Sequence, residues 1–181
     1  VSLSNLQRQI LYRSADTGRL KLEAAAQALT ALNPGVTINA HALRLTADNA
    51  AALVSGYGIV ADGSDNFETR FALADVCRTA QKPLVSAAVS EFGGQLSTFK
   101  PYESGRPCYR CLVPAAPDGA RPCSETGVLG AAAGVMGSLQ ALEVLKEIAG
   151  FGDSLAGRLL IYEALAPRMR VLDIGSGWGG L

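Results

Sequence analysis

The chain has 181 residues, of which 49% are hydrophobic and 18% are charged, and sixteen cations balance sixteen anions. This length and apolar content predict one domain with a sizeable core and argue against an intrinsically disordered protein. The zero formal net charge argues against a general binder of nucleic acid or of membrane surfaces, because both need an excess of basic residues. Any anion site must therefore be local.

Helices and strands alternate in the first half of the chain. Apolar residues at helical spacing predict a helix over 17–32, which Asn33-Pro34 ends. Alternation of apolar and polar residues predicts a strand over 36–42. Further expected elements are a helix over 47–54, a strand over 58–62, a helix over 66–80 and a strand over 83–89. This order is typical of parallel βαβ units in a Rossmann-like, doubly wound α/β sheet.

The pattern changes after residue 90. We expect a strand over 93–100, a Pro/Gly/Cys-rich segment over 101–127, a helix over 128–149, and strands over 158–163 and 168–174. These strands predict a C-terminal mixed or antiparallel extension of the sheet. A doubly wound domain normally opens with a strand, a glycine-rich turn and a helix. The chain starts after such a unit, so we expect the fold to be incomplete at its N-terminus.

The sequence was searched for a signal peptide, a membrane-spanning stretch and disulfide-forming cysteines. Residues 1–10 lack a basic start followed by an apolar run, so they predict no signal peptide. The most apolar stretch, 128–139, is too short to span a bilayer and favours a buried helix. Four cysteines without a secretory cue favour a reduced, cytoplasmic setting over disulfides.

An acidic turn follows the expected strand over 58–62. Its residues Asp62, Asp65 and Asn66 would lie at the carboxyl edge of the sheet, where ligands bind in open α/β folds. Carboxylates at this edge suit Mg²⁺ that is also held by substrate phosphates. The alternative is that these are ordinary turn and helix-capping residues.

Four cations, Arg8, Arg13, Arg19 and Lys21, gather in the first twenty-one residues. Guanidinium groups match phosphate oxygens in geometry, and lysine supplies a point charge. The cluster therefore indicates a local phosphate site. The alternative is a solvated, charged helix face.

The cysteines suggest two further sites. Cys108 and Cys111 have the spacing of half a tetrahedral zinc site, and Cys123 could be a third ligand. Cys123 also precedes the helix expected at 128, where the helix dipole favours thiolate, so it is a candidate nucleophile. The alternatives are a redox pair for the first two and a partly buried thiol for the third. Cys77 falls in an apolar helix and is expected in the core.

The last eleven residues, 171–181, look like the glycine-rich loop of S-adenosylmethionine-dependent methyltransferases. Such a loop needs a helix after its glycines and an acidic residue beyond, and the sequence given contains neither. A methyltransferase is therefore disfavoured.

Several motifs in this order resemble a known family. They are "SNLQRQILY", Lys21, "DGSDNFETR", "CYRCL", "CSETGV" and "GVMGSLQALEVLK". They are similar to the ThiF/MoeB/HesA family of ubiquitin-activating-like adenylyltransferases, most of all to its molybdopterin-synthase branch. The resemblance implies one ThiF-type adenylation domain over 1–181, without its N-terminal glycine-rich unit. It also implies ATP-dependent adenylylation of the C-terminal glycine of a ubiquitin-like sulfur carrier, of MoaD or ThiS type, for molybdopterin or thiamine-type biosynthesis.

The resemblance also implies roles for single residues. The ATP site would contain Ser4, Asn5, Leu6, Gln7, Arg8, Lys21, Asp65 and Asn66. Asn5 and Arg8 would contact phosphates, Lys21 would steady the transferring charge, and Asp65 would hold Mg²⁺. Cys108 and Cys111 would be half of a zinc site, and Cys123 would link covalently to the activated carrier or its sulfur. The resemblance further implies a homodimer, and it makes a sulfurtransferase a candidate partner.

The alternative within this family is a non-catalytic member that only binds a ubiquitin-like partner. Arg8, Lys21 and Asp65 are all present, which favours catalysis. The family's glycine-rich ATP loop and ribose-binding aspartate lie before Val1, so we expect residues 1–181 alone to bind ATP poorly.

Overall fold

The computed structural model describes residues 1–117, 119 and 127–175. Two compact units divide the chain, Val1–Arg44 and Leu45–Leu181, and each is described by itself. The N-terminal unit holds two short 3₁₀ helices, η1 (Leu3–Asn5) and η2 (Ser14–Asp16), followed by α1 (Lys21–Leu32). The predicted helix is confirmed but begins at Lys21. Gly18 has a left-handed backbone (φ +89°), which does not occur inside a right-handed helix, so residues 17–20 lie before α1.

The strand predicted over 36–42 is wrong. These residues form neither helix nor strand, and the five-stranded sheet does not include them. Alternation produces a strand only where a neighbouring strand supplies hydrogen bonds and a surface to bury one face. Val36 is 51% exposed, and Ala40 and Ala42 are exposed as well, so three of the four apolar positions of this segment lack such a surface.

The second unit is built on one sheet with strand order β1-β2-β3-β4-β5. Its strands are β1 (Val60–Asp62), β2 (Leu84–Ser90), β3 (Gly93–Phe99), β4 (Arg158–Glu163) and β5 (Arg168–Asp173). β1 and β2 are parallel, and the other three pairs are antiparallel. The Rossmann-like α/β class with an antiparallel C-terminal extension is confirmed.

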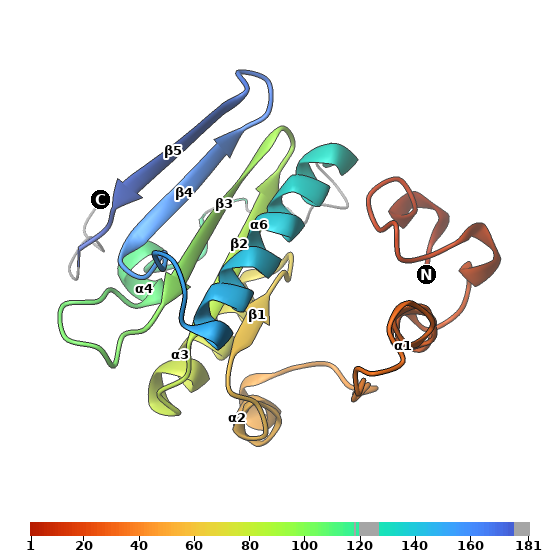
Figure 1. Ribbon diagram of the computed structural model, residues 1–181, viewed down its shortest axis with the longest axis horizontal. Coiled ribbons are helices and arrows are strands. Elements are labelled where there is room, and N and C mark those ends of the chain that lie inside the picture. Colours follow the sequence, from red (N-terminus) through yellow and green to blue (C-terminus); the bar gives the residue numbers. More distant parts are fainter. Residues whose placement is uncertain (118, 120–126, 176–181) are drawn as a thin grey trace. The chain divides into compact units, whose positions relative to one another are not determined.

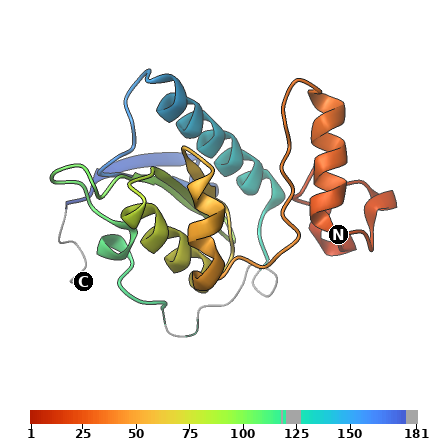
Figure 2. The ribbon, with the colours of Figure 1, turned by 90° about the horizontal axis from the view of Figure 1, so that it is seen from below.

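Helices cover both faces of this sheet (Figures 1 and 2). The helices are α2 (Ala47–Ser55), α3 (Phe67–Thr79), α4 (Tyr109–Leu112) and α6 (Gly130–Ala149). α6 lies on one face, and α2, α3 and α4 lie on the other. Successive residues of β2 serve the two faces: Leu84 packs in the cluster with α3 and α4, and Val85 packs with Met136 of α6. This follows from the period-2 alternation of strand side chains.

α6 approaches the sheet closely at Gly94 of β3. An added Cβ at Gly94 would lie 2.6 Å from Met136 Cγ and 2.7 Å from the carbonyl oxygen of Ala88. The stretch 128–139, predicted as a buried helix, is buried only in part: Val128, Ala132 and Met136 are buried, and Leu129, Ala131 and Ser138 are exposed. Leu142, Leu145 and Ile148 are about half exposed or more, because a helix on one sheet face buries a single stripe. In the described residues, no helix is long and apolar enough to cross a membrane.

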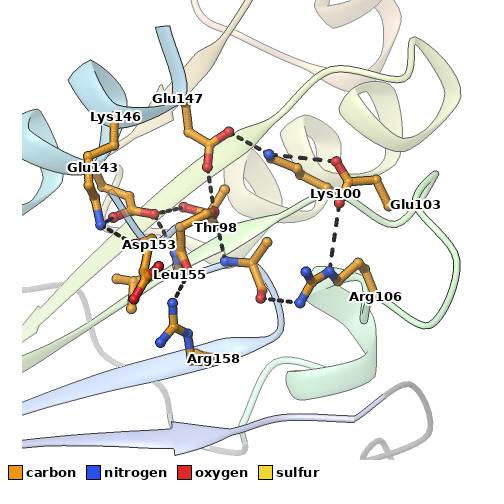
Figure 3. Close-up of polar contacts among 12 residues, drawn as sticks. Thr98, Lys100, Glu103, Arg106, Glu143, Lys146, Glu147, Asp153, Leu155 and Arg158 are labelled. Atoms are coloured by element: carbon orange, nitrogen blue, oxygen red, sulfur yellow. Dashed lines mark hydrogen bonds and ion pairs between the residues drawn. The ribbon is translucent and has the colours of Figure 1, made fainter. Parts of the chain in front are cut away.

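The buried carboxylate of Glu143 fixes α6 along the sheet (Figure 3). Glu143 is 1% exposed, and its Oε1 accepts hydrogen bonds from the hydroxyl of Thr98 (3.0 Å) and the N–H of Leu155 (2.5 Å). Lys146 pairs with its Oε2 and also donates to the carbonyl oxygen of Asp153 (2.6 Å). A buried carboxylate is tolerated when its oxygens are paired in this way. The network therefore ties α6 to β3 and to the loop before β4.

Candidate active site

The acidic turn lies at the carboxyl end of β1, and Asp62 shapes it from within. Asp62 is 2% exposed, and its Oδ1 accepts the N–H of Ser64 (2.9 Å) while its Oδ2 accepts the hydroxyl of Ser86 (3.1 Å). Both carboxylate oxygens thus have partners inside the protein. Asp62 braces the turn and is not available as a free metal ligand.

Two long side chains hold the same turn from opposite faces of the sheet. From α6, Gln140 Nε2 donates to the carbonyl oxygens of Asp62 (2.8 Å) and Val85 (3.0 Å). From α3, Arg70 donates through Nε (3.1 Å) and Nη2 (2.6 Å) to the carbonyl oxygen of Ser64. The sequence prediction missed both residues. Arg70 lies about one helical turn after the acidic turn, so its nearness in sequence could have indicated the contact. Gln140 is 78 residues from Asp62, and no local pattern of the sequence connects the two.

Asp65 is the exposed carboxylate of the turn. In the part of the chain that the structure describes, it makes no hydrogen bond or ion pair. Asn66, beside it, caps α3 by accepting the N–H of Thr69 (2.9 Å). Asn66 therefore performs the ordinary capping role that the sequence left open. A free carboxylate at the carboxyl edge of the sheet can bind a hard cation.

The phosphate-binding residues expected in the N-terminal unit lie on and after η1. The Arg8 side chain folds back so that its Nη1 donates to the carbonyl oxygen of Ser4 (3.2 Å), and its own N–H donates to the carbonyl oxygen of Asn5 (3.1 Å). The structure thus brings Ser4, Asn5 and Arg8 together. Leu6 and Gln7 complete this turn. It is a short, compact turn that carries one cation.

Lys21 and Arg19 lie close in sequence but differ in their contacts. Lys21 is the first residue of α1 and is exposed, without a hydrogen-bond partner among the described residues. Arg19 pairs with Asp16 (2.6 Å) and donates to Gln27 (2.9 Å). The pKa of Asp16 is lowered, first by the backbone N–H of Arg13 and then by Arg19. Lys21 is therefore the cation free for a ligand, and Arg19 is structural.

The Cys-x-x-Cys pair opens the one-turn helix α4. Cys108 caps the helix, its Sγ lies 2.6 Å from Cys111 Sγ, and each backbone N–H donates to the other sulfur. Burial is the main cause that raises the pKa of Cys108. Two thiols supply half of a tetrahedral site. Among the described residues, no group of three or more His, Cys, Asp or Glu side chains gathers that could hold a metal.

The structure describes Cys77 but not Cys123. Cys77 is 1% exposed in the core between α3 and the sheet, so its predicted structural role is confirmed. Cys123, the candidate nucleophile, lies outside the described residues. The same holds for residues 176–181 of the glycine-rich tail.

Sequence comparison matches almost the whole chain to known proteins. A family model for the ThiF family matches residues 1–176. The sulfur carrier protein adenylyltransferase of Thermus thermophilus is 45% identical over 96% of this chain and 66% of its own length. The adenylyltransferase and sulfurtransferase MOCS3 of Bos taurus is 46% identical over 96% of this chain and 38% of its own. The chain thus spans less than two thirds of these relatives.

Solved structures share the fold. E. coli MccB, solved with MccA-N7isoASN, aligns with a TM-score of 0.79 at 18% identity, over 97% of this chain and 55% of MccB. PaaA aligns with a TM-score of 0.77 at 20% identity, over 97% of this chain and 54% of PaaA. At this identity the likeness concerns the fold alone.

Proposed function

The chain belongs to the ThiF family, and from that premise we propose that it carries out ATP-dependent adenylylation of the C-terminal glycine of a ubiquitin-like sulfur carrier. Two relatives support this proposal: the Thermus thermophilus protein is a sulfur carrier protein adenylyltransferase, and MOCS3 is an adenylyltransferase and sulfurtransferase. The observation that carries the proposal is Asp65, a carboxylate without a partner among the described residues, on a turn in which Asp62 and the Ser64 carbonyl oxygen are tied to the protein.

In the proposed reaction, a carboxylate oxygen of the carrier attacks the α-phosphorus of ATP. A bond forms between that oxygen and phosphorus, the bond from phosphorus to the bridging oxygen breaks, and pyrophosphate leaves with its electrons. Arg8 and Asn5 bind phosphate oxygens, and Lys21 offsets the charge that develops on the transferring group. Asp65 holds Mg²⁺, which when bound neutralises phosphate charge.

The remaining assignments belong to the same proposal. The ATP site comprises Ser4, Asn5, Leu6, Gln7, Arg8, Lys21, Asp65 and Asn66, within one ThiF-type adenylation domain over 1–181. Cys108 and Cys111 provide half of a zinc site, and Cys123 links to the activated carrier or its sulfur. The partners are a carrier of MoaD or ThiS type, a sulfurtransferase and a second copy of the chain, in the cytoplasm.

Carrier-dependent exchange of labelled pyrophosphate into ATP tests this function in the full-length protein. We expect Asp65→Asn to lower the exchange rate by about 10²–10³-fold, because the neutral amide holds the cation poorly. Asp48→Asn, which changes another exposed aspartate in the first turn of α2, is the matched control and should stay within about twofold.

Two results would overturn this assignment. Full exchange by Asp65→Asn would remove the metal role of Asp65. Binding of the carrier without any exchange by the unmodified protein would indicate a non-catalytic member of the family.

A further inference from the structure

The backbone of the acidic turn is tied to α6 through one side chain. The amide of Gln140 has two hydrogens on Nε2, and it donates to the carbonyl oxygens of Asp62 (2.8 Å) and Val85 (3.0 Å). Val85 is paired with Ala61 in the parallel ladder of β1 and β2, and Asp62 is the last residue of β1. Gln140 therefore bridges two adjacent strands where β1 ends and the turn begins.

Gln140 is itself held in place by its neighbours on α6. Met136 lies one turn before it and is 1% exposed against the sheet, in contact range of Gly94. Glu143 lies almost one turn after it and is bound to Thr98 and Leu155 (Figure 3). Because α6 is fixed on both sides of Gln140, the helix can set the position of the turn and not merely follow it.

Several groups of the turn around Asp65 are held by partners in the protein. The Asp62 carboxylate, the Ser64 carbonyl oxygen and the Asn66 side chain all have partners in the protein. Asp65 lies three residues after Asp62, and its carboxylate is directed to no partner in the described chain. A shift of the Asp62 carbonyl would therefore be passed to Asp65. Displacement of a catalytic group by about 1 Å can reduce a rate by about 10²-fold.

We infer that Gln140 is a positioning residue, which sets the place of the Asp65 carboxylate by fixing the backbone of residues 62–65 from α6. The inference rests on the proposed function, since it assigns Gln140 a part in the same reaction. It does not make Gln140 a catalytic residue, because both of its donor contacts are to main-chain carbonyl oxygens.

The test compares two nearly isosteric variants of the full-length protein. Gln140→Met keeps the length and helix preference of the side chain but removes both donors. Thr98→Val is the matched control: it removes another hydrogen bond between α6 and the sheet, from the Thr98 hydroxyl to Glu143. Thr98 is fully buried on β3, where it pairs with Val85, and its hydroxyl bonds Glu143 and not the turn. In this variant the N–H of Leu155 and the Lys146 side chain still hold Glu143. Both variants lose a contact between helix and sheet, and only one loses the tie to the turn.

Three functional quantities are measured for both variants, and the midpoint of urea unfolding records their stability. We expect Gln140→Met to lower the carrier-dependent exchange rate about tenfold or more. We also expect it to raise the Mg²⁺ concentration for half-maximal exchange about threefold or more, since Asp65 moves relative to the phosphates. Amide hydrogen exchange of residues 63–66 should accelerate about tenfold. Thr98→Val should leave the last two quantities unchanged, even where the midpoint of urea unfolding falls as much as in Gln140→Met.

The outcomes separate the two proposals. If the unmodified protein exchanges pyrophosphate and Gln140→Met matches it in rate and Mg²⁺ dependence, the role of Gln140 is overturned and the proposed function stands. Equal effects of both variants on Mg²⁺ dependence would reduce Gln140 to a general stabilising residue, which also overturns the inference. If the unmodified protein shows no exchange, the proposed function fails, and the inference fails with it. Should Gln140→Met not fold, Gln140→Asn, which shortens the side chain by one methylene, gives the same comparison.

Discussion

At the scale of single residues, polar groups that look alike in the sequence have opposite fates in the structure. Asp62 and Asp65 are three residues apart in one acidic turn. Asp62 is buried with both oxygens paired, and Asp65 is exposed without a partner in the described chain. The same contrast separates Arg19, which is bound to Asp16, from Lys21. Burial and pairing, and not residue type, decide which side chains are available to a ligand.

The cysteines give a prediction at this scale. Burial raises the pKa of Cys77 to about 11, so only about one thiol in 10³ is deprotonated at pH 8. We expect native protein at pH 8 to leave Cys77 unmodified by iodoacetamide, as judged by mass spectrometry of its tryptic peptide. The same peptide should be fully labelled in guanidinium chloride, which is the control. Labelling of Cys77 in native protein within minutes would contradict its place in the core.

At the scale of elements, the position of the acidic turn depends on how closely α6 packs on β3. The sequence predicts α6 and β3 individually, and their contact is set by Gly94, where a side chain would meet Met136 and the Ala88 carbonyl oxygen. The helix then presents Glu143 to Thr98 and Gln140 to the acidic turn. One element thus joins the structural network to the proposed site.

The packing of α6 gives a prediction with a matched pair of glycines. Gly94→Ala should lower the free energy of unfolding by about 1–3 kcal/mol, because the main-chain oxygen of Ala88 cannot move aside cheaply. Gly134→Ala lies inside α6 with no atom within 4 Å of the added Cβ, so it should raise stability by about 0.5–1 kcal/mol. Urea unfolding followed by circular dichroism measures both. Destabilisation of equal size by the two substitutions would contradict this account of the helix–sheet contact.

At the scale of the whole molecule, the chain divides between Arg44 and Leu45. The proposed phosphate-binding residues Arg8 and Lys21 belong to the first unit, and Asp65 belongs to the second. Between α1 and α2 the residues form neither helix nor strand, and most are exposed.

This division predicts an early trypsin cut in the segment between α1 and α2. Arg44 is the one trypsin site between α1 and α2 and is exposed, and irregular exposed backbone is the preferred substrate of proteases. We expect cleavage after Arg44 to precede cleavage after Arg158, which lies in β4, when the products are followed by mass spectrometry. Arg44→Gln should abolish the early product. Equally fast cleavage after Arg158 would contradict the assignment of a stable sheet in the second unit.

The sequence by itself determined the elements whose patterns are local. Helical spacing and the proline after Asn33 predicted α1, and turn residues before Phe67 predicted α3, which Asn66 caps. The order of short motifs was sufficient to indicate the family that the comparisons then showed. Each of these signals lies within a few residues, so it needs no knowledge of the chain's path.

Only the tertiary structure decided the features that depend on distant partners. Residues 36–42 alternate as a strand does, yet no strand pairs with them in the described chain. The stretch 128–139 is apolar enough to appear buried, but α6 rests on one sheet face and Leu129, just before the helix, is 45% exposed. Gln140 reaches Asp62 across 78 residues. Hydrogen bonding and burial are set by which surfaces meet in space, and the local pattern of a sequence does not contain that information.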